Sequence, residues 1–169
     1  MITFEESNMT FSFEEDDVFR IEKSMQFNCI AGAKTCECVV MFHDKVTFIE
    51  AKSSSPQPRN NGIASPVFER FTDGIADKFS DSLAYFTATH LKRHLPELLP
   101  IHLQAIPLSK QEYEFCLIIF GHQTAWLPPV LDQLKKSMKK MLKLWGLNDA
   151  CIKVLNEHMA LSKGLIKNQ

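Results

Sequence analysis

Two acidic residues and a lysine lie in neighbouring apolar segments, at a spacing that could support metal-ion chemistry. Glu37 belongs to the segment Cys36 to Phe42, and Glu50 belongs to the segment Lys45 to Ala51, which Lys52 follows directly. The gap between the segments is short, as in two strands joined by a tight hairpin turn. Both acids and the lysine would then belong to one small antiparallel unit.

The register of this hairpin decides whether the acids meet. A two-residue loop pairs Phe42 with Lys45, and the same register places Glu37 opposite Glu50, with β carbons about 4.5 to 5.5 Å apart. Lys52 shares their face of the sheet. Opposed like charges destabilise a sheet with apolar neighbours, so a divalent cation held by both carboxylates would relieve the repulsion. The alternative is a chance hairpin with solvated acids near its ends, and a longer loop would move Glu37 to the opposite face.

Length and composition favour a single domain, residues 1–169, with a substantial core. The chain is 45% hydrophobic and contains 13 Phe, which is ample for one domain. A net charge of -1 and a pI near 6.6 differ from the strongly basic composition of many nucleic-acid-binding proteins, so any nucleic-acid contact must be local. We expect the first residues, about 1–8, to be frayed.

The cysteines and the hydropathy pattern favour a reducing cytoplasm and no membrane association. The 5 Cys include no CxxC pair, and Cys36 and Cys38, as alternate residues of one strand, are expected to point to one face as buried thiols. No apolar run approaches the roughly 18 residues of a membrane helix. No signal sequence opens the chain. We therefore expect a cytoplasmic protein.

Periodicity and turn residues predict an α/β fold with a central mixed sheet around the hairpin. Ser65 is expected to cap a helix that begins at Pro66 and runs to about His94. Further patterns predict a strand at 113–120, a helix at 127–145, a strand at 151–155 and a short helix at 156–161. The segment 18–30 fits either a strand or a helix. Because both faces of the hairpin are largely apolar, we expect helices on both faces of the sheet.

The order of these motifs resembles the PD-(D/E)XK nuclease superfamily, whose fold is also called restriction-endonuclease-like. The resemblance rests on Glu37 opening one strand, on the E-x-K motif Glu50-Ala51-Lys52 of the next, and on the helix and strand that follow. It implies that Glu37 and Glu50 coordinate Mg²⁺ or Mn²⁺ with help from the Ala51 carbonyl, and that Lys52 orients the attacking water. The implied activity is hydrolysis of phosphodiester bonds in nucleic acid.

Departures from the family pattern leave a second function open. The first acid is Glu37 rather than Asp, and no proline precedes it. Some members carry a further glutamate near the N-terminus, for which Glu22 is the nearest candidate, although an exposed ion-pairing acid explains Glu22 as well. The alternative is a degenerate restriction-endonuclease-like module that binds a protein or nucleic-acid partner without cleavage.

Polar residues elsewhere support weaker predictions. Gln57 and Arg59, just beyond the E-x-K motif, are either phosphate contacts or solvated loop residues. His90 and His94 have helical spacing, but no third ligand follows, so a surface pair is preferred over a zinc site. A basic stripe on the second helix could follow a nucleic-acid backbone, although solvation alone also explains it; the stripe comprises Lys136, Lys139, Lys140 and Lys143. No Gly-rich phosphate loop is present, which disfavours nucleotide cofactors.

Overall fold

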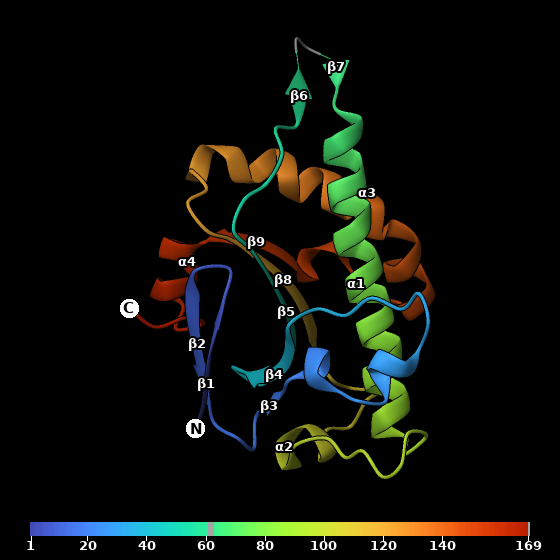
Figure 1. Ribbon diagram of the computed structural model, residues 1–169. Helices are drawn as coiled ribbons and strands as arrows, with labels where there is room; N and C mark the ends of the chain where they lie inside the picture. The colour runs from blue at the N-terminus through green and yellow to red at the C-terminus, as the bar shows by residue number, and fades with distance from the viewer. Residues whose placement is uncertain (61–62, 169) are drawn as a thin grey trace.

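The centre of the protein is a five-stranded mixed sheet. The computed structural model describes residues 1–60 and 63–168. The strands follow the spatial order β3 (Val18–Phe19), β4 (Cys38–Phe42), β5 (Lys45–Lys52), β8 (Tyr113–Ile119) and β9 (Ile152–Asn156) (Figure 1). The first three are antiparallel, whereas β5, β8 and β9 run parallel. The predicted mixed α/β architecture is confirmed at this level.

Strands β4 and β5 form the predicted two-residue hairpin. Phe42 pairs with Lys45, and the rest of the ladder keeps this register. The loop residues His43 and Asp44 both have positive φ angles, of 48° and 61°. Positive φ at both central positions is typical of the type I′ turn, whose twist matches that of the flanking strands. The turn therefore fixes which side chains share a face.

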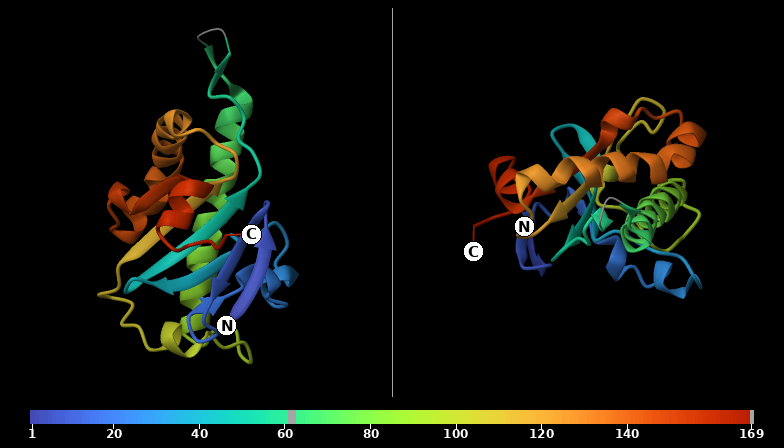
Figure 2. Two further views of the ribbon diagram at one scale, coloured as in Figure 1. Left: turned by 90° about the vertical axis from the view of Figure 1, so that its left-hand side faces the viewer. Right: turned by 90° about the horizontal axis from the view of Figure 1, so that it is seen from above.

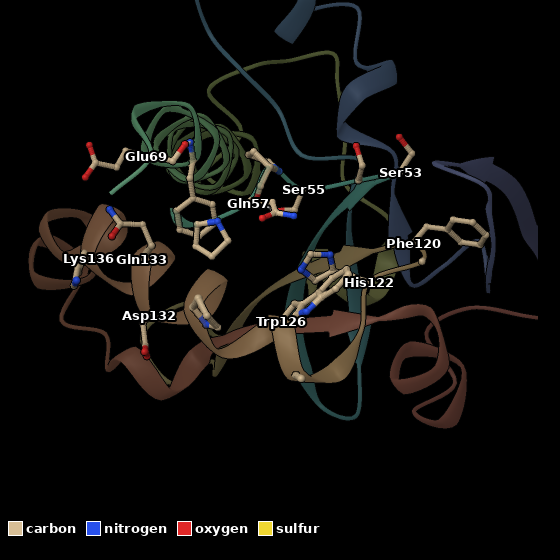
Figure 3. Close-up of a pocket in the computed structure, with 18 residues that line it drawn as sticks. Ser53, Ser55, Gln57, Glu69, Phe120, His122, Trp126, Asp132, Gln133 and Lys136 are labelled. Atoms are coloured by element: carbon tan, nitrogen blue, oxygen red, sulfur yellow. Dashed lines mark hydrogen bonds between the residues drawn. The ribbon is translucent and has the colours of Figure 1, made fainter. Parts of the chain in front are cut away.

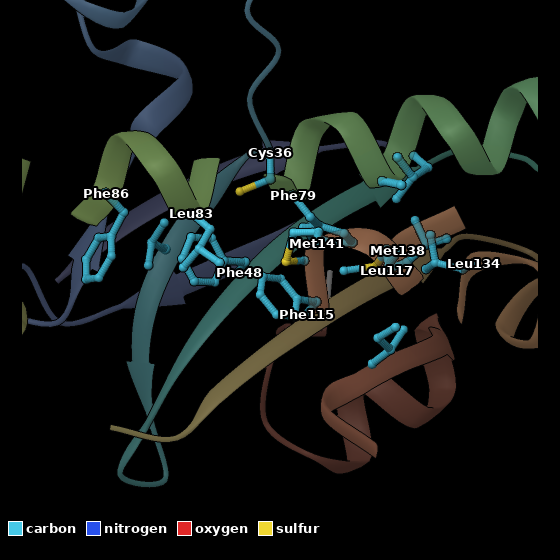
Figure 4. Close-up of a cluster of buried hydrophobic side chains, with 14 of the residues drawn as sticks. Cys36, Phe48, Phe79, Leu83, Phe86, Phe115, Leu117, Leu134, Met138 and Met141 are labelled. Atoms are coloured by element: carbon cyan, nitrogen blue, oxygen red, sulfur yellow. The ribbon is translucent and has the colours of Figure 1, made fainter. Parts of the chain in front are cut away.

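Two long helices cover one face of the sheet, α1 (Pro66–His90) and α3 (Leu127–Trp145) (Figures 1 and 2). Between them and the strands lies the main core, shown in Figure 4. Phe115 is at its centre, since its ring stacks on Phe48 at 5.2 Å and meets Phe79 edge-on at 5.5 Å. The apolar stripes of both helices are therefore core-facing, as their spacing predicts.

The ends of these helices follow the predicted capping residues. The Ser65 hydroxyl accepts a hydrogen bond from the Phe68 amide, and Pro66 occupies the first turn of α1. Gly146 ends α3 in the left-handed conformation, with φ at 65°. Helix α1 stops at His90 instead of continuing to His94, and the chain leaves the helix at Leu91.

The opposite face of the sheet corrects two expectations. The first residues, 1–8, are not frayed, because β1 (Ile2–Glu6) pairs along its whole length with β2 (Met9–Phe13). This hairpin buries Phe11 completely, and the ring of Phe4 stacks on it at 5.2 Å. The only helix that joins this layer within the described residues is the short α4 (Glu157–Ser162). A β hairpin thus provides most of the cover that we expected from helices.

Shorter elements connect this framework. The ambiguous segment 18–30 begins as β3 and continues as 3₁₀ helices at Ile21–Lys23 and Phe27–Cys29. Helix α2 (Ile101–Gln104) lies in the connection before β8, and β6 (Arg59–Asn60) pairs with β7 (Ile63–Ala64). Two further 3₁₀ turns span Thr124–Trp126 and Asp149–Cys151. Across the described ranges, no helix is both long enough and apolar enough to cross a membrane.

Candidate active site at the edge of the sheet

Glu50 is the centre of a cluster of charged side chains. It lies near the end of β5 and is fully buried, with 0% of its surface exposed. One of its oxygens, Oε1, lies 2.6 Å from Lys52 Nζ and 2.6 Å from Lys78 Nζ. Its other oxygen, Oε2, is buried and has no hydrogen-bond partner within the described residues. Half of this carboxylate is therefore strongly paired, and the other half has no partner in the described part of the chain.

Glu37 meets the same cluster from the position that immediately precedes β4. Its Oε1 lies 3.9 Å from Lys78 Nζ, so the carboxylates of Glu37 and Glu50 both approach one ammonium group. Lys52 pairs with Glu50, and Lys78 links Glu50 to Glu37, so the structure brings the three predicted residues into one network of charges through Lys78. A basic side chain from α1 lies between the acids, at the position where we expected a divalent cation.

The backbone at Glu37 departs from the regular strand that we predicted. The Glu37 amide donates to the Ile49 carbonyl at 2.9 Å, and the regular ladder starts one residue later, at Cys38. Cys36 packs in the core beneath α1, whereas Cys38 packs in the core on the opposite face. The expectation that these two thiols share a face is wrong, because the chain has not yet entered regular strand geometry at Cys36.

Further acidic residues surround Glu37. Ligand oxygens of Glu6, Glu22 and Glu37 lie within 4.8 Å of one another. Glu6 ends β1, and Glu22 lies in the 3₁₀ helix after β3. Arg20 pairs with Glu22, and its guanidinium lies 3.5 Å from the centre of the Phe4 ring. Glu37 is therefore approached both by Lys78 from α1 and by Glu6 from the β1–β2 hairpin.

The acids near Glu37 do not share charge equally. Burial raises the pKa of Glu37 to about 8, and the hydrogen bond with Glu22 and the charge of Glu50 add to this effect. Burial acts in the same direction on Glu22, but the hydrogen bond with Glu37 and the Arg20 guanidinium outweigh it and lower the pKa of Glu22. At neutral pH the proton of this pair therefore resides mainly on Glu37.

Lys78 is held in its charged form by the same carboxylates. Burial opposes the ammonium charge, but the Glu50 carboxylate, with a smaller effect from Glu37, outweighs burial and raises the pKa of Lys78. Lys78 was not predicted as a site residue. A sequence indication existed, since Lys78 lies between Ile75 and Ser82 in the stripe of α1 that the structure buries. A lysine in such a stripe can bury its carbon chain and extend its ammonium group to a partner.

The remaining residues that the sequence singled out are not part of this charged cluster as the structure describes it. Ala51 is buried in the ladder opposite Ile118, and a metal-binding role of its carbonyl stays a prediction. The rings of His90 and His94 each have an aromatic neighbour, Phe86 and Tyr85 respectively. Residue Gln57 lines the neighbouring cavity. The side chain of Arg59 lies outside the described residues.

A cavity of about 1000 Å³ lies beyond the ends of β5 and β8 (Figure 3). It begins at Ser53, the residue that follows Lys52, but none of Glu37, Glu50, Lys52 and Lys78 lines it. The side chain of Lys52 is 31% exposed, whereas Glu50 and Ala51 are buried, so Lys52 is the residue of the E-x-K motif that solvent reaches. The carboxyl ends of parallel strands are a common location for ligand sites in open α/β sheets.

Comparison with known proteins gives no match. No protein-family model matches this chain, and no curated protein and no solved structure is significantly similar to it. The fold and the site define a mixed α/β protein with a cluster of acids and lysines at the carboxyl end of β5, the middle strand of the sheet.

Proposed function

We propose that this protein is a metal-dependent hydrolase of phosphodiester bonds in nucleic acid, with a site of the PD-(D/E)XK type. The order of the elements supports the proposal. An acid immediately before β4 is followed by E-x-K at the end of β5, then by helix α1 and by strand β8. This is the order on which the resemblance rests, and the side chains of Glu37, Glu50 and Lys52 are linked in one cluster through Lys78.

The observation that carries the proposal is the unpartnered Oε2 of Glu50. Within the described residues this buried carboxylate oxygen has no donor, which is costly, and native structures contain few such groups. Glu37 is linked to Glu50 through Lys78, and the ligand oxygens of Glu37, Glu6 and Glu22 form a neighbouring group within 4.8 Å of one another. Oxygen ligands of this kind fit a hard divalent cation such as Mg²⁺ or Mn²⁺. When bound, such an ion polarises a phosphoryl oxygen and makes its bound water more acidic.

The lysines have distinct tasks in this proposal. The side chain of Lys52 is partly exposed, and its ammonium pairs with Glu50; in this role it stabilises negative charge on an attacked phosphate or orients a water molecule. Lys78 holds the carboxylates of Glu37 and Glu50 in their positions. Because Lys78 contributes from α1, any change in that helix also changes the arrangement of the two acids.

One observation favours the alternative, a degenerate module that binds a partner without cleavage. Lys78 already lies between the two acids, with Nζ 3.9 Å from Glu37 and 2.6 Å from Glu50, and the raised pKa of Glu37 removes most of the remaining repulsion at neutral pH. A protein that has replaced a metal ion by a lysine would keep the fold and lose the chemistry. The two functions therefore differ in whether the cluster responds to a divalent cation.

The test combines cleavage with thermal stability. Labelled single-stranded and duplex DNA and RNA are incubated with the protein in Mg²⁺ or Mn²⁺, and the melting temperature is measured with and without each ion. The hydrolase predicts cleavage and a metal-dependent rise in melting temperature, since a ligand at a hundred times its Kd stabilises a protein by about 2.7 kcal/mol. Both effects should be lost in Glu50→Gln.

A matched control is Glu112→Gln. Glu112 is an exposed carboxylate that pairs with Lys45 at 3.0 Å on the surface, so its loss should change neither cleavage nor the response to metal. Lys52→Met should abolish cleavage while preserving the rise in melting temperature. If the native protein shows neither cleavage nor a metal response, the hydrolase proposal is wrong and the binding module is favoured.

A further inference from the structure

The cavity beside the charged cluster has features that the proposed reaction does not require. We propose that this cavity, together with the adjoining lysine groove of α3, binds single-stranded nucleic acid and that an unpaired base stacks on Trp126. The inference deepens the proposed hydrolase function and rests on it, because it names the substrate class. Its support comes from exposed aromatic rings, a positioned loop and a continuous basic surface.

Exposed aromatic side chains lie along one wall of the cavity. Trp126 is 48% exposed and lines the cavity together with His122 and Phe120; the Phe120 ring points away from the other two in Figure 3. The His122 ring meets the indole edge-on, with ring centres 5.4 Å apart, as Figure 3 shows. Every nucleobase has a π face that can stack on such a ring without regard to sequence. An exposed indole at the wall of a cavity is thus suited to an unpaired base.

The loop that carries His122 and Trp126 is held in place by the side chain of Asn156. Asn156, which is buried at the end of β9, donates to the His122 carbonyl at 3.0 Å and to the Thr124 hydroxyl at 3.2 Å. The same Asn156 side chain accepts from the Met159 amide and so caps α4. Because its position is fixed before any ligand arrives, the aromatic wall loses little conformational freedom on binding.

A basic groove continues from the cavity along α3. It has a volume of about 460 Å³ and no acidic lining residue among those described, and Lys136 lines both the cavity and the groove. Within residues 1–60 and 63–168, none of the lysines of this groove forms an ion pair with a carboxylate. They are therefore available to phosphate groups. The groove lysines are Lys136, Lys139, Lys140 and Lys143.

The distribution of charge sets the orientation of the ligand. Glu69 and Asp132 line the cavity but not the groove. Carboxylates repel phosphate, but they accept hydrogen bonds from the exocyclic amino groups of bases, and Gln133 beside them can donate as well as accept. The base therefore enters the cavity while its phosphates follow the groove. In a duplex the base faces are stacked and the pairing edges are occupied, so a single strand is the ligand that fits.

Binding is tested separately from cleavage, with labelled single-stranded DNA and RNA oligonucleotides in EDTA and fluorescence anisotropy as the readout. Trp126→Ala should weaken binding roughly tenfold to a hundredfold, which is the range for loss of one stacked base. Trp145→Ala is the matched control, since Trp145 is an exposed tryptophan at the C-terminal end of α3 and does not line the cavity. This variant should bind normally. In a Trp145→Phe protein, the remaining indole emission should be quenched by the oligonucleotide.

The basic groove is tested with the double variant Lys136→Ala and Lys140→Ala. It should bind more weakly, and the magnitude of the slope of log affinity against log salt should fall by about 0.7 for each phosphate of the single strand that the variant no longer neutralises. A duplex of the same sequence should bind more weakly than the single strand. Equal effects of Trp126→Ala and Trp145→Ala, or preference for the duplex, would overturn the inference.

Failure of this inference can be separated from failure of the proposed function. Trp126-dependent binding without cleavage in Mg²⁺ or Mn²⁺ would support the binding surface and exclude the hydrolase. Cleavage with an unchanged KM in Trp126→Ala would overturn the binding surface and leave the hydrolase in place.

Discussion

Replacement of Lys78 by methionine gives the sharpest test of the charged cluster. The substitution keeps most of the carbon chain of the lysine and removes the ammonium group between Glu37 and Glu50. At 2.6 Å from Glu50 Oε1, that group contributes about 6 kcal/mol of Coulomb energy at an effective dielectric constant of ~20. At 3.9 Å from Glu37 Oε1 it adds about 4 kcal/mol once Glu37 is ionised. These gross values exceed the expected loss, because the buried ammonium also gives up hydration.

The expected net loss in the free energy of unfolding is about 2 to 4 kcal/mol. This is slightly less than the cost of leaving a buried charge with no partner of opposite charge. Lys52 moderates the loss, since it stays bonded to Glu50 Oε1 at 2.6 Å. The loss should be larger at pH 9 than at pH 6. Glu37, whose pKa is raised to about 8, is mostly ionised at pH 9, so Lys78 then compensates two carboxylates instead of one.

The assay is urea denaturation of the native protein and of Lys78→Met at pH 6 and pH 9, with and without Mg²⁺. The control is Lys139→Met, which makes the same chemical change at an exposed position of α3. If a cation can take the place of the ammonium, Mg²⁺ should stabilise Lys78→Met more than the native protein. A loss no larger than that of Lys139→Met, or one independent of pH, would refute the assigned role of Lys78.

Three further predictions concern neighbouring residues. Glu37 has a folded-state pKa raised from 4.5 to about 8. Its contribution to the free energy of unfolding is therefore present below pH 4.5 and is lost as the pH rises through 8. Between pH 5 and pH 9, the urea midpoint should decline less for Glu37→Gln than for the native protein. Glu50→Gln should lower stability by about 2 to 4 kcal/mol, because it leaves two ammonium groups without their carboxylate, and the melting temperature measures this. Asn156→Ala should cost about 1 to 3 kcal/mol and speed hydrogen exchange at the Met159 amide, which loses its acceptor. The variant also removes the donor to the His122 carbonyl and the Thr124 hydroxyl.

Local chemistry explains which parts of the fold could be predicted. The Ser65 cap, the proline that follows it and Gly146 after α3 each act within one turn of helix, and they place helix ends where the sequence indicates. The two-residue turn at His43 and Asp44 fixes the register of β4 and β5 through its own backbone angles. Each of these features depends on neighbours in sequence, so the amino-acid order is sufficient to find it.

Contacts between distant segments explain the rest. Lys78 reaches Glu50 from α1, and Glu6 reaches Glu37 from the first hairpin. The stripe of α1 indicates that Lys78 is partly buried, but nothing in the sequence identifies the partner of either residue. The hairpin of β1 and β2 was missed as a layer because its short alternating segments, such as Met9 to Phe13, are stabilised by the sheet beneath them. An isolated two-stranded hairpin of this length is marginal in water.

The position of Lys78 also changes the reason for expecting a metal ion. From the sequence, repulsion between Glu37 and Glu50 requires a compensating cation, and the ammonium of Lys78 already supplies one. What still favours a divalent ion is the second oxygen of Glu50, which is buried and without a partner in the described part of the chain. A metal response that survives in Glu37→Gln but disappears in Glu50→Gln would therefore identify that oxygen, rather than the repulsion between the acids, as the basis of metal binding.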